Sequence, residues 1–240
     1  MRRIKITLAY DGGGFHGWQV QPGLPTIQGT LEQIISDMEG APVHVAGSGR
    51  TDAGVHALAQ VAAFTIANPI PLVNLRRAVN RLLPPAIRVL AAEEVAPDFH
   101  PRFNAKAKTY EYRIVRGDVC SPFEWPYVHH YPYRLDVERM AALAGVFEGE
   151  HDFTAYAASD DRDAEGKSKV RTVFSSVLER PEGRLVYRVR GSGFLKHMVR
   201  NIVGTLIEAG KGNVADITRL PERTGPTAPA KGLFLIGVEY

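Results

Sequence analysis

The chain has 240 residues, 45% of them hydrophobic and 23% charged, enough for one large domain or two small ones with a buried core. This composition argues against collagen-like, disordered and disulfide-rich classes. A single cysteine, Cys120, can form neither an internal disulfide nor a cysteine metal cage, which favours a reducing compartment. No apolar run approaches the roughly 18 residues of a membrane helix, and the first residues alternate like a strand rather than a signal peptide. We therefore expect a soluble, cytoplasmic protein.

The net charge of +3 hides strong local charges, and the basic residues are 21 arginines and 8 lysines. Arginine offers a flat, bidentate fork to phosphates and stacks on bases. Positive charge is concentrated in 76–88, 101–116 and 167–200, and negative charge in 136–165. This distribution indicates a surface that faces a polyanion. Codon bias and solvated helix faces are the simpler explanations.

The first hundred residues predict the order β-α-β-β-α-β. Period-two alternation indicates strands, and Thr26 is a candidate cap for an amphipathic helix. In chain order the predicted elements are a strand at 4–8, a helix at 26–39, strands at 42–47 and 59–66 around a polar loop, a helix at 71–83 and a strand at 87–95.

The second half repeats that order and then ends on a strand. Its predicted elements are a strand at 105–116, a helix at 135–147, a hairpin at 169–179 and 184–191, helices at 194–209 and 213–220, and a strand at 233–239. We expect flexibility at 158–167. The aromatic, Pro-rich stretch 121–132 should be an ordered loop, because aromatic side chains need burial.

Together the two halves predict an α+β protein. Residues 1–100 and 101–240 are expected to form two ferredoxin-like halves of the split β-α-β type, with the catalytic loop in the first half and a tyrosine strand and basic helix in the second. Their strands should form a mostly antiparallel, mixed sheet with helices on one side, and the active-site cleft should lie between the halves.

The polar loop between the second and third strands has the densest chemistry, with the sequence GSGRTDAGVHA at 47–57. Its glycines allow a sharp turn and close approach to a ligand. In an extended stretch Arg50 and Asp52 lie on one side, and an aspartate beside an arginine stays ionised, ready to act as a nucleophile or base. An ordinary glycine-rich turn, with Asp52 bonded to its own backbone, is the alternative.

Two further segments could face a ligand. Tyr110 and Tyr112 share one face of their strand and would be a base-stacking platform if exposed, or ordinary core if buried. The helix at 194–209 has four polar residues in its first turns, where its dipole favours anions; they are Lys196, His197, Arg200 and Asn201. A plain surface helix explains them equally well.

Nucleotide-cofactor and metal sites are not indicated. The glycines at 12–14 lack the lysine and hydroxyl of a P-loop, and no G-x-G-x-x-G opens a helix. The eight histidines do not have metal-ligand spacing. No G-x-S-x-G elbow is present.

Taken together, the motifs resemble the bacterial tRNA pseudouridine synthase A family from residue 3 to 240. The strings that carry the resemblance are YDG at 10–12, FHGWQxQP at 15–22, TIQGxLE at 26–32, GRTDAGVHA at 49–57, KTYEYR at 108–113, FxxHMVRNIVG at 194–204 and TAPAxGL at 227–233.

This resemblance implies an isomerase that converts uridine to pseudouridine at positions 38, 39 and 40 of the tRNA anticodon stem-loop. It implies no cofactor and no metal, and a homodimer in which each tRNA touches both subunits. The target uridine must be flipped out of its stem, at a cost of roughly a few kcal/mol. Attack, cleavage of the glycosidic bond, rotation of the uracil and reattachment through carbon 5 would follow.

The resemblance also implies roles for individual residues. Asp52 matches the essential aspartate that attacks the flipped nucleotide, and Arg200 matches the basic residue paired with it. Tyr110 matches the tyrosine that stacks on the base, and it is a candidate acceptor for the final proton although a phenol is a poor base. Arg50 matches the arginine that holds the flipped state, and Leu233 is expected to line the uracil pocket.

Two other classes of protein remain as alternatives at this point. A non-catalytic RNA-binding protein could use two ferredoxin-like halves, although the usual RNP aromatic motif is absent. A hydrolase could cut a nucleoside bond with Asp52 and would release free uracil, which an isomerase must not do.

Overall fold

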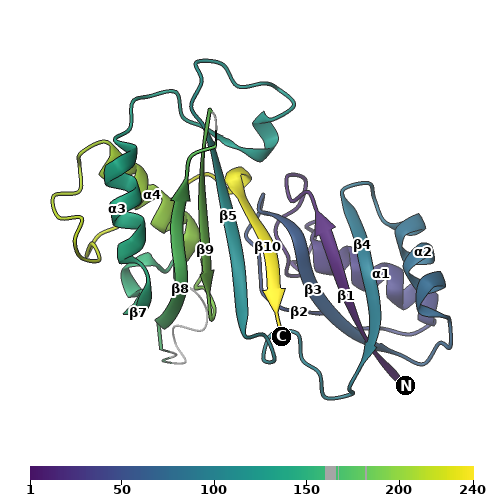
Figure 1. Ribbon diagram of the computed structural model, residues 1–240. Helices are drawn as coiled ribbons and strands as arrows, with labels where there is room; N and C mark the ends of the chain where they lie inside the picture. Colours follow the sequence, from purple (N-terminus) through teal and green to yellow (C-terminus); the bar gives the residue numbers. More distant parts are fainter. Residues whose placement is uncertain (160–165, 167, 182) are drawn as a thin grey trace. The chain divides into compact units, whose positions relative to one another are not determined.

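The computed structural model describes residues 1–159, 166, 168–181 and 183–240 (Figure 1). By their contacts these residues form two compact units, Met1–Lys106 with Phe234–Tyr240, and Ala107–Leu233. The C-terminal strand thus returns to the first unit, a connection that a single cut near residue 100 does not include. The expected flexible segment 158–167 falls largely outside the described residues.

The first unit is built on a sheet in the order β4-β1-β3, with β1 antiparallel to both neighbours. Two strands share the other edge of β3: β2 pairs antiparallel at Ala62 and Ala63, and β10 pairs parallel at His56 and Ala57. The elements are β1 (Arg2–Tyr10), α1 (Ile27–Glu39), β2 (Ala46–Gly47), β3 (His56–Ile66), α2 (Leu72–Leu82), β4 (Ile87–Val95) and β10 (Leu233–Glu239).

Both helices of this unit pack on one face of the sheet. Alternate residues of β1 are buried there, as the period-two pattern predicts. Thr26 caps α1 by accepting a hydrogen bond from the Gly29 amide at 3.2 Å, and Gly40 ends it with φ of 75°. The residues that meet in this core are Ile4, Ile6, Leu8, Leu31, Ile35, Leu75 and Val79.

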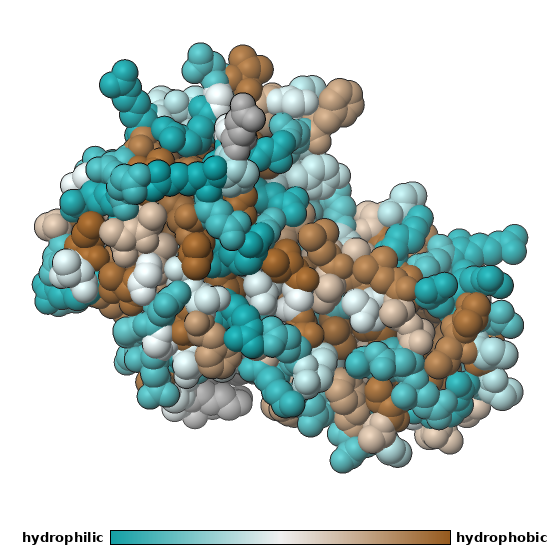
Figure 2. Space-filling model, in the orientation of Figure 1, coloured by the Kyte–Doolittle hydropathy of each residue, from teal (hydrophilic) through white to brown (hydrophobic). Residues whose placement is uncertain are grey.

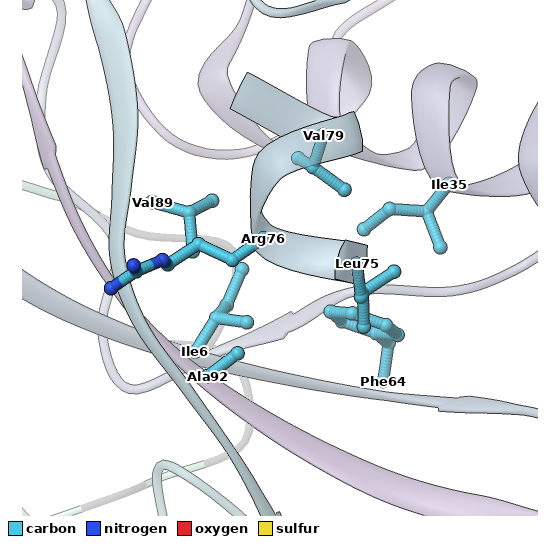
Figure 3. A pocket seen from close by; sticks show the side chains of 8 residues that line it. All are labelled: Ile6, Ile35, Phe64, Leu75, Arg76, Val79, Val89 and Ala92. Atoms are coloured by element: carbon cyan, nitrogen blue, oxygen red, sulfur yellow. The ribbon is translucent and has the colours of Figure 1, made fainter. Parts of the chain in front are cut away.

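A small gap in the same core is lined by Ile6, Ile35, Phe64, Leu75, Arg76, Val79, Val89 and Ala92. At about 10 Å³ it barely reaches the volume of one water molecule. Figure 3 shows the Arg76 guanidinium directed away from the apolar side chains, and it donates to the Leu90 carbonyl at 2.9 Å. The gap is therefore a packing feature of the core and not a ligand site.

The second unit has a sheet in the order β5-β9-β8-β7, antiparallel throughout, with β6 added parallel to β5. The fold class is therefore α+β with mostly antiparallel pairing, as the sequence predicts. The elements are β5 (Ala107–Val115), β6 (His129–His130), α3 (Val137–Val146), β7 (Gly149–Asp152), β8 (Val170–Glu179), β9 (Arg184–Gly191) and α4 (Met198–Gly210), with short 3₁₀ turns at Trp125–Tyr127, Thr154–Tyr156 and Ala230–Gly232.

One helix prediction in this unit is wrong, and a second helix is confirmed but begins later than predicted. α4 begins at Met198 rather than at residue 194, because His197 precedes it in the left-handed region with φ of 62°. Residues 213–220 are irregular, with bends at Ala215, Thr218 and Arg219, instead of a helix. There the Asp216 carboxylate accepts from both the amide and the hydroxyl of Thr218, a local alternative to helical hydrogen bonds.

The aromatic stretch 121–132 is ordered but not buried. Phe123 is 88% exposed and Trp125 is 50% exposed, so the expectation of burial is wrong. The Nζ of Lys231 lies 3.4 Å from the centre of the Trp125 ring, a cation–π contact that orders the indole without burying it. On the side drawn in Figure 2, hydrophobic residues are interspersed with hydrophilic ones.

Candidate active site

The loop between β2 and β3 carries Arg50 and Asp52 in the first unit. Thr51, between them, is buried, whereas Arg50 is exposed and Asp52 is partly exposed. This alternation is what the sequence predicts for an extended stretch with both charged residues on the outer side. A carboxylate held on a fixed loop and accessible from outside can act as a nucleophile or base.

A buried network of side chains holds the base of this loop. The hydroxyl of Tyr10 lies 2.8 Å from Oγ1 of Thr51, and Ser48 donates to the side-chain oxygen of Gln60 at 2.6 Å. The Gln60 amide in turn donates to the Gly49 carbonyl at 3.0 Å. Burial raises the pKa of Tyr10 to about 12 against the opposing effect of its hydrogen bonds with Thr51 and Gln60. The phenol therefore stays neutral and serves as a structural hydroxyl.

The segment from Gly12 to Trp18 packs directly against the loop. A β-carbon on Gly12 would lie 2.0 Å from the Val55 carbonyl oxygen, and one on Gly17 would lie 2.5 Å from that of Thr51. Gly17 also has φ of 86°. The Trp18 amide donates to the Thr51 carbonyl at 3.0 Å. Only glycine permits this approach of two backbones, so Gly12 and Gly17 have a packing role, whereas nothing lies within 4 Å of a β-carbon placed on Gly14.

The second unit carries the tyrosine strand. Tyr110 and Tyr112 are both buried, at 7% and 0% exposure. The hydroxyl of Tyr112 donates to the Pro229 carbonyl at 2.8 Å, and burial raises its pKa although nearby Arg200 opposes the shift. Tyr110 packs edge-on against Phe194, with ring centres 5.1 Å apart. Tyr112 is therefore core, and an open platform of two tyrosines is ruled out in this structure.

The first turns of α4 are tied to the C-terminal segment of the same unit. Arg200 donates through Nε to the Ala228 carbonyl at 2.8 Å, and Thr227 donates to the side-chain oxygen of Asn201 at 2.7 Å. A β-carbon on Gly204 would lie 1.9 Å from the Pro226 carbonyl. Asn201 is thus used internally, whereas Arg200 is held in a defined orientation. The same segment leads to Leu233, which is 5% exposed.

The site residues predicted from the sequence fall into two groups. Arg50 and Asp52 lie together in the first unit, and Tyr110, Arg200 and Leu233 lie in the second. Sequence reasoning missed the buried polar residues that support the loop, namely Tyr10, Ser48, Thr51, His56 and Gln60. A glutamine within the apolar run LAQVAAF of β3 was the available signal.

Within the ranges that the structure describes, no three His, Cys, Asp or Glu side chains gather as a metal site. In the same ranges, no helix is long and apolar enough to cross a membrane.

Comparison with known proteins defines the family. Residues 6–104 and 143–240 match the family model described as tRNA pseudouridine synthase. The chain is 78% identical to the tRNA pseudouridine synthase A of Solibacter usitatus (strain Ellin6076) over 240 residues, which is 100% of both chains. It is 45% identical to that of Lacticaseibacillus casei (strain BL23) over 250 residues, again 100% of both. The full-length relatives also span the region around Tyr110 that the family model leaves out.

A solved structure is more distantly similar, a chain of the archaeal box H/ACA sRNP Nop10-Cbf5 complex. It has 12% identity and a TM-score of 0.36 over 85% of this chain and 43% of that one.

The full-length matches define the class of protein as an isomerase that acts on uridine in tRNA. Within that class, the chain belongs to the tRNA pseudouridine synthase A family.

Proposed function

We propose that this isomerase forms pseudouridine at positions 38, 39 and 40 of the anticodon stem-loop, with Asp52 as the attacking group. The single observation that supports Asp52 most directly is its place on a rigidly backed loop, partly exposed beside a buried Thr51. A uridine in a stem is out of reach of such a carboxylate, so the nucleotide flips out before the reaction.

In the proposed reaction Asp52 attacks the flipped nucleotide and the bond between the sugar and nitrogen 1 of uracil breaks. The uracil rotates in place, and carbon 5 bonds to the sugar as Asp52 is released. Carbon 5 then loses its proton and nitrogen 1 gains one, so that substrate and product have the same atoms. Nothing is oxidised or reduced, which is why the proposal includes no cofactor and no metal.

The remaining site residues bind and orient. Tyr110 stacks on the base, and its edge contact with Phe194 holds the phenol ring in one orientation. Arg200 pairs with Asp52 and keeps the carboxylate ionised, and its hydrogen bond to Ala228 limits the positions of the guanidinium. Arg50 stabilises the flipped state, either by filling the space that the nucleotide vacates or by binding a phosphate. Leu233 lines the uracil pocket.

The basic segments supply candidate contacts to tRNA phosphates, and hydrogen bonding separates them into two kinds. Arg88 donates to the carbonyls of Leu83, Pro84 and Ile87, so it is structural. Arg77 and Arg81 are exposed on α2, a helix without acidic residues, and neither makes an ion pair within the described residues. We assign these two to phosphate contact.

The test is tritium release from tRNA labelled at carbon 5 of uridine, for wild type and Asp52→Asn. The proposal expects release by wild type on transcripts with uridine at positions 38 to 40, and none by the variant. A non-catalytic binding protein would release nothing, and a hydrolase would release free uracil. Full activity in Asp52→Asn would reject the assignment of Asp52 as the nucleophile but would leave the isomerase activity supported.

The proposal also includes a cytoplasmic homodimer in which each tRNA touches both subunits. Sedimentation of the protein with and without tRNA tests this part. A monomer that is fully active at the concentration of the assay would contradict it.

A further inference from the structure

His56 is a buried histidine at the start of β3, four residues after Asp52. Its side chain is 2% exposed, and its ring stacks on Phe234 with centres 4.7 Å apart and planes 21° apart. The backbones of His56 and Phe234 are also paired between β3 and β10. The ring is therefore fixed on one side by the last strand of the first unit.

The Nδ1 atom of His56 has two neighbours on the segment after β1. It accepts a hydrogen bond from the Gly12 amide at 3.1 Å, and the carboxylate of Asp11 lies 3.1 Å away. A ring nitrogen cannot accept from an amide and donate to a carboxylate at once. The Asp11 oxygen already accepts from the Gly13 amide at 2.9 Å. The tautomer that keeps the Gly12 hydrogen bond has the lone pair on Nδ1 and the proton on the buried Nε2.

The hydrogen bond from the Gly12 amide to His56 lies where the Gly12 backbone contacts the Val55 backbone. Gly12 has no room for a β-carbon because the Val55 carbonyl would lie 2.0 Å from it. The Val55 amide donates to the Asp52 carbonyl at 3.1 Å and so closes the turn that carries the carboxylate. A displacement of Gly12 therefore moves Val55, and with it the backbone of Asp52.

We propose that His56, through the acceptor Nδ1, is a positioning residue that fixes the Asp52 turn against Gly12. The inference deepens the proposed function and rests on Asp52 as the attacking group. His56 does not touch the substrate in this scheme. Its effect is on the rate of the bound complex, because a misplacement of about 1 Å can cost about a hundredfold in rate.

Two variants distinguish the contribution of the Nδ1 acceptor from that of the stacked ring. His56→Phe keeps the stack on Phe234 and removes the acceptor, whereas His56→Asn places an amide oxygen near the Nδ1 position and loses the stack. We expect His56→Phe to lower kcat between about 10- and 100-fold with little change in KM. We expect His56→Asn to be less stable to heat than His56→Phe and yet more active.

The decisive readout is whether His56→Phe and His56→Asn rank in opposite orders for activity and for thermal stability. If His56 only fills space, activity at saturating tRNA will follow stability, and His56→Phe will be the better enzyme; that result overturns the proposal. Asp11→Asn is the control for the contact between Asp11 and His56, because the Asn side-chain oxygen can still accept from the Gly13 amide. We expect it to stay within about twofold of wild type. A reduction as large as that of His56→Phe would instead assign positioning to the pair of His56 and Asp11.

A measurement on the unmodified protein covers the case in which both His56 variants fail to fold. Nitrogen-15 shifts of the imidazole should report an unprotonated Nδ1 and a protonated Nε2 in the folded protein. A proton on Nδ1 would overturn the inference whatever the activity data. An inactive wild type with the expected tautomer would instead reject the proposed function, so the two failures are distinguishable.

Discussion

The phenol oxygen of Tyr10 lies 2.8 Å from Oγ1 of Thr51, and both side chains are buried. This hydrogen bond joins the end of β1 to the residue immediately before Asp52. It ties the position of the proposed nucleophile to the sheet of the first unit rather than to the loop alone.

Tyr10→Phe should therefore reduce both stability and activity. The substitution keeps the ring but leaves the polar groups of Thr51 and Gln60 without the hydroxyl, at about 1–3 kcal/mol. We expect several-fold lower kcat as well, because the loop is less firmly held. Tyr187→Phe is the matched control, since its buried hydroxyl bonds to Ser176 at 2.8 Å in the second unit. Urea unfolding and the tritium assay should show similar destabilisation and an activity loss in Tyr10→Phe alone.

Gly12→Ala should be strongly disruptive, because its new methyl group would lie 2.0 Å from the Val55 carbonyl. Relief of this overlap requires the two segments to separate, and we expect stability to fall by at least about 2 kcal/mol. Gly14→Ala is the control, since nothing lies within 4 Å of that position, and it should change stability by less than about 0.5 kcal/mol. Equal melting temperatures for the two variants would contradict the close approach.

Arg200→Ala should give a folded protein with a large loss of activity at neutral pH. Arg200 is proposed to keep Asp52 ionised, and the substitution also removes the hydrogen bond to Ala228, at a cost to the fold of about 1 kcal/mol. Arg200→Lys keeps the charge without the guanidinium geometry and should recover part of the rate. A normal rate for Arg200→Ala would mean that another cation stabilises Asp52.

Removal of Arg77 and Arg81 should weaken tRNA binding in a salt-dependent way. In the double variant Arg77→Gln/Arg81→Gln, the slope of log affinity against log salt should fall by about one for each phosphate that is no longer neutralised. The double variant Arg180→Gln/Arg219→Gln makes the same charge change at exposed arginines that pair with Glu138 and Asp216. The control should leave the slope unchanged. Equal slopes for both double variants would reject the assignment of Arg77 and Arg81 to phosphate contact.

Glu111 should make the stability of the protein depend on pH in the acid range. Burial of the carboxyl is outweighed by hydrogen bonds from Arg188 and Arg113, so its pKa is lowered from 4.5. A lowered pKa in the folded state gives stabilisation that is complete above the unfolded value and is lost as the pH falls through the folded value. The gap in unfolding free energy between wild type and Glu111→Gln should therefore be larger at neutral pH than at pH about 3. A constant gap would contradict the ion pairs of Glu111.

The sequence by itself determined the features that depend on neighbours along the chain. The alternation in β1, the cap at Thr26 and the apolar stripe of α1 predict their elements within a residue or two, since strand and helix periods are local properties. The motif strings around Asp52 and Arg200 determined the family for the same reason, because each string is continuous in the chain.

Only the tertiary structure decided what depends on residues distant in sequence. His197 adopts a left-handed backbone conformation, so α4 begins only at Met198. No local sequence pattern predicts this conformation. Tyr112 became core because its strand face packs inside the second unit. The return of β10 to β3 brings Phe234 onto His56, residues separated by most of the chain. A buried polar group must find a partner wherever the fold provides one, and therefore the support of the Asp52 loop became visible only in three dimensions.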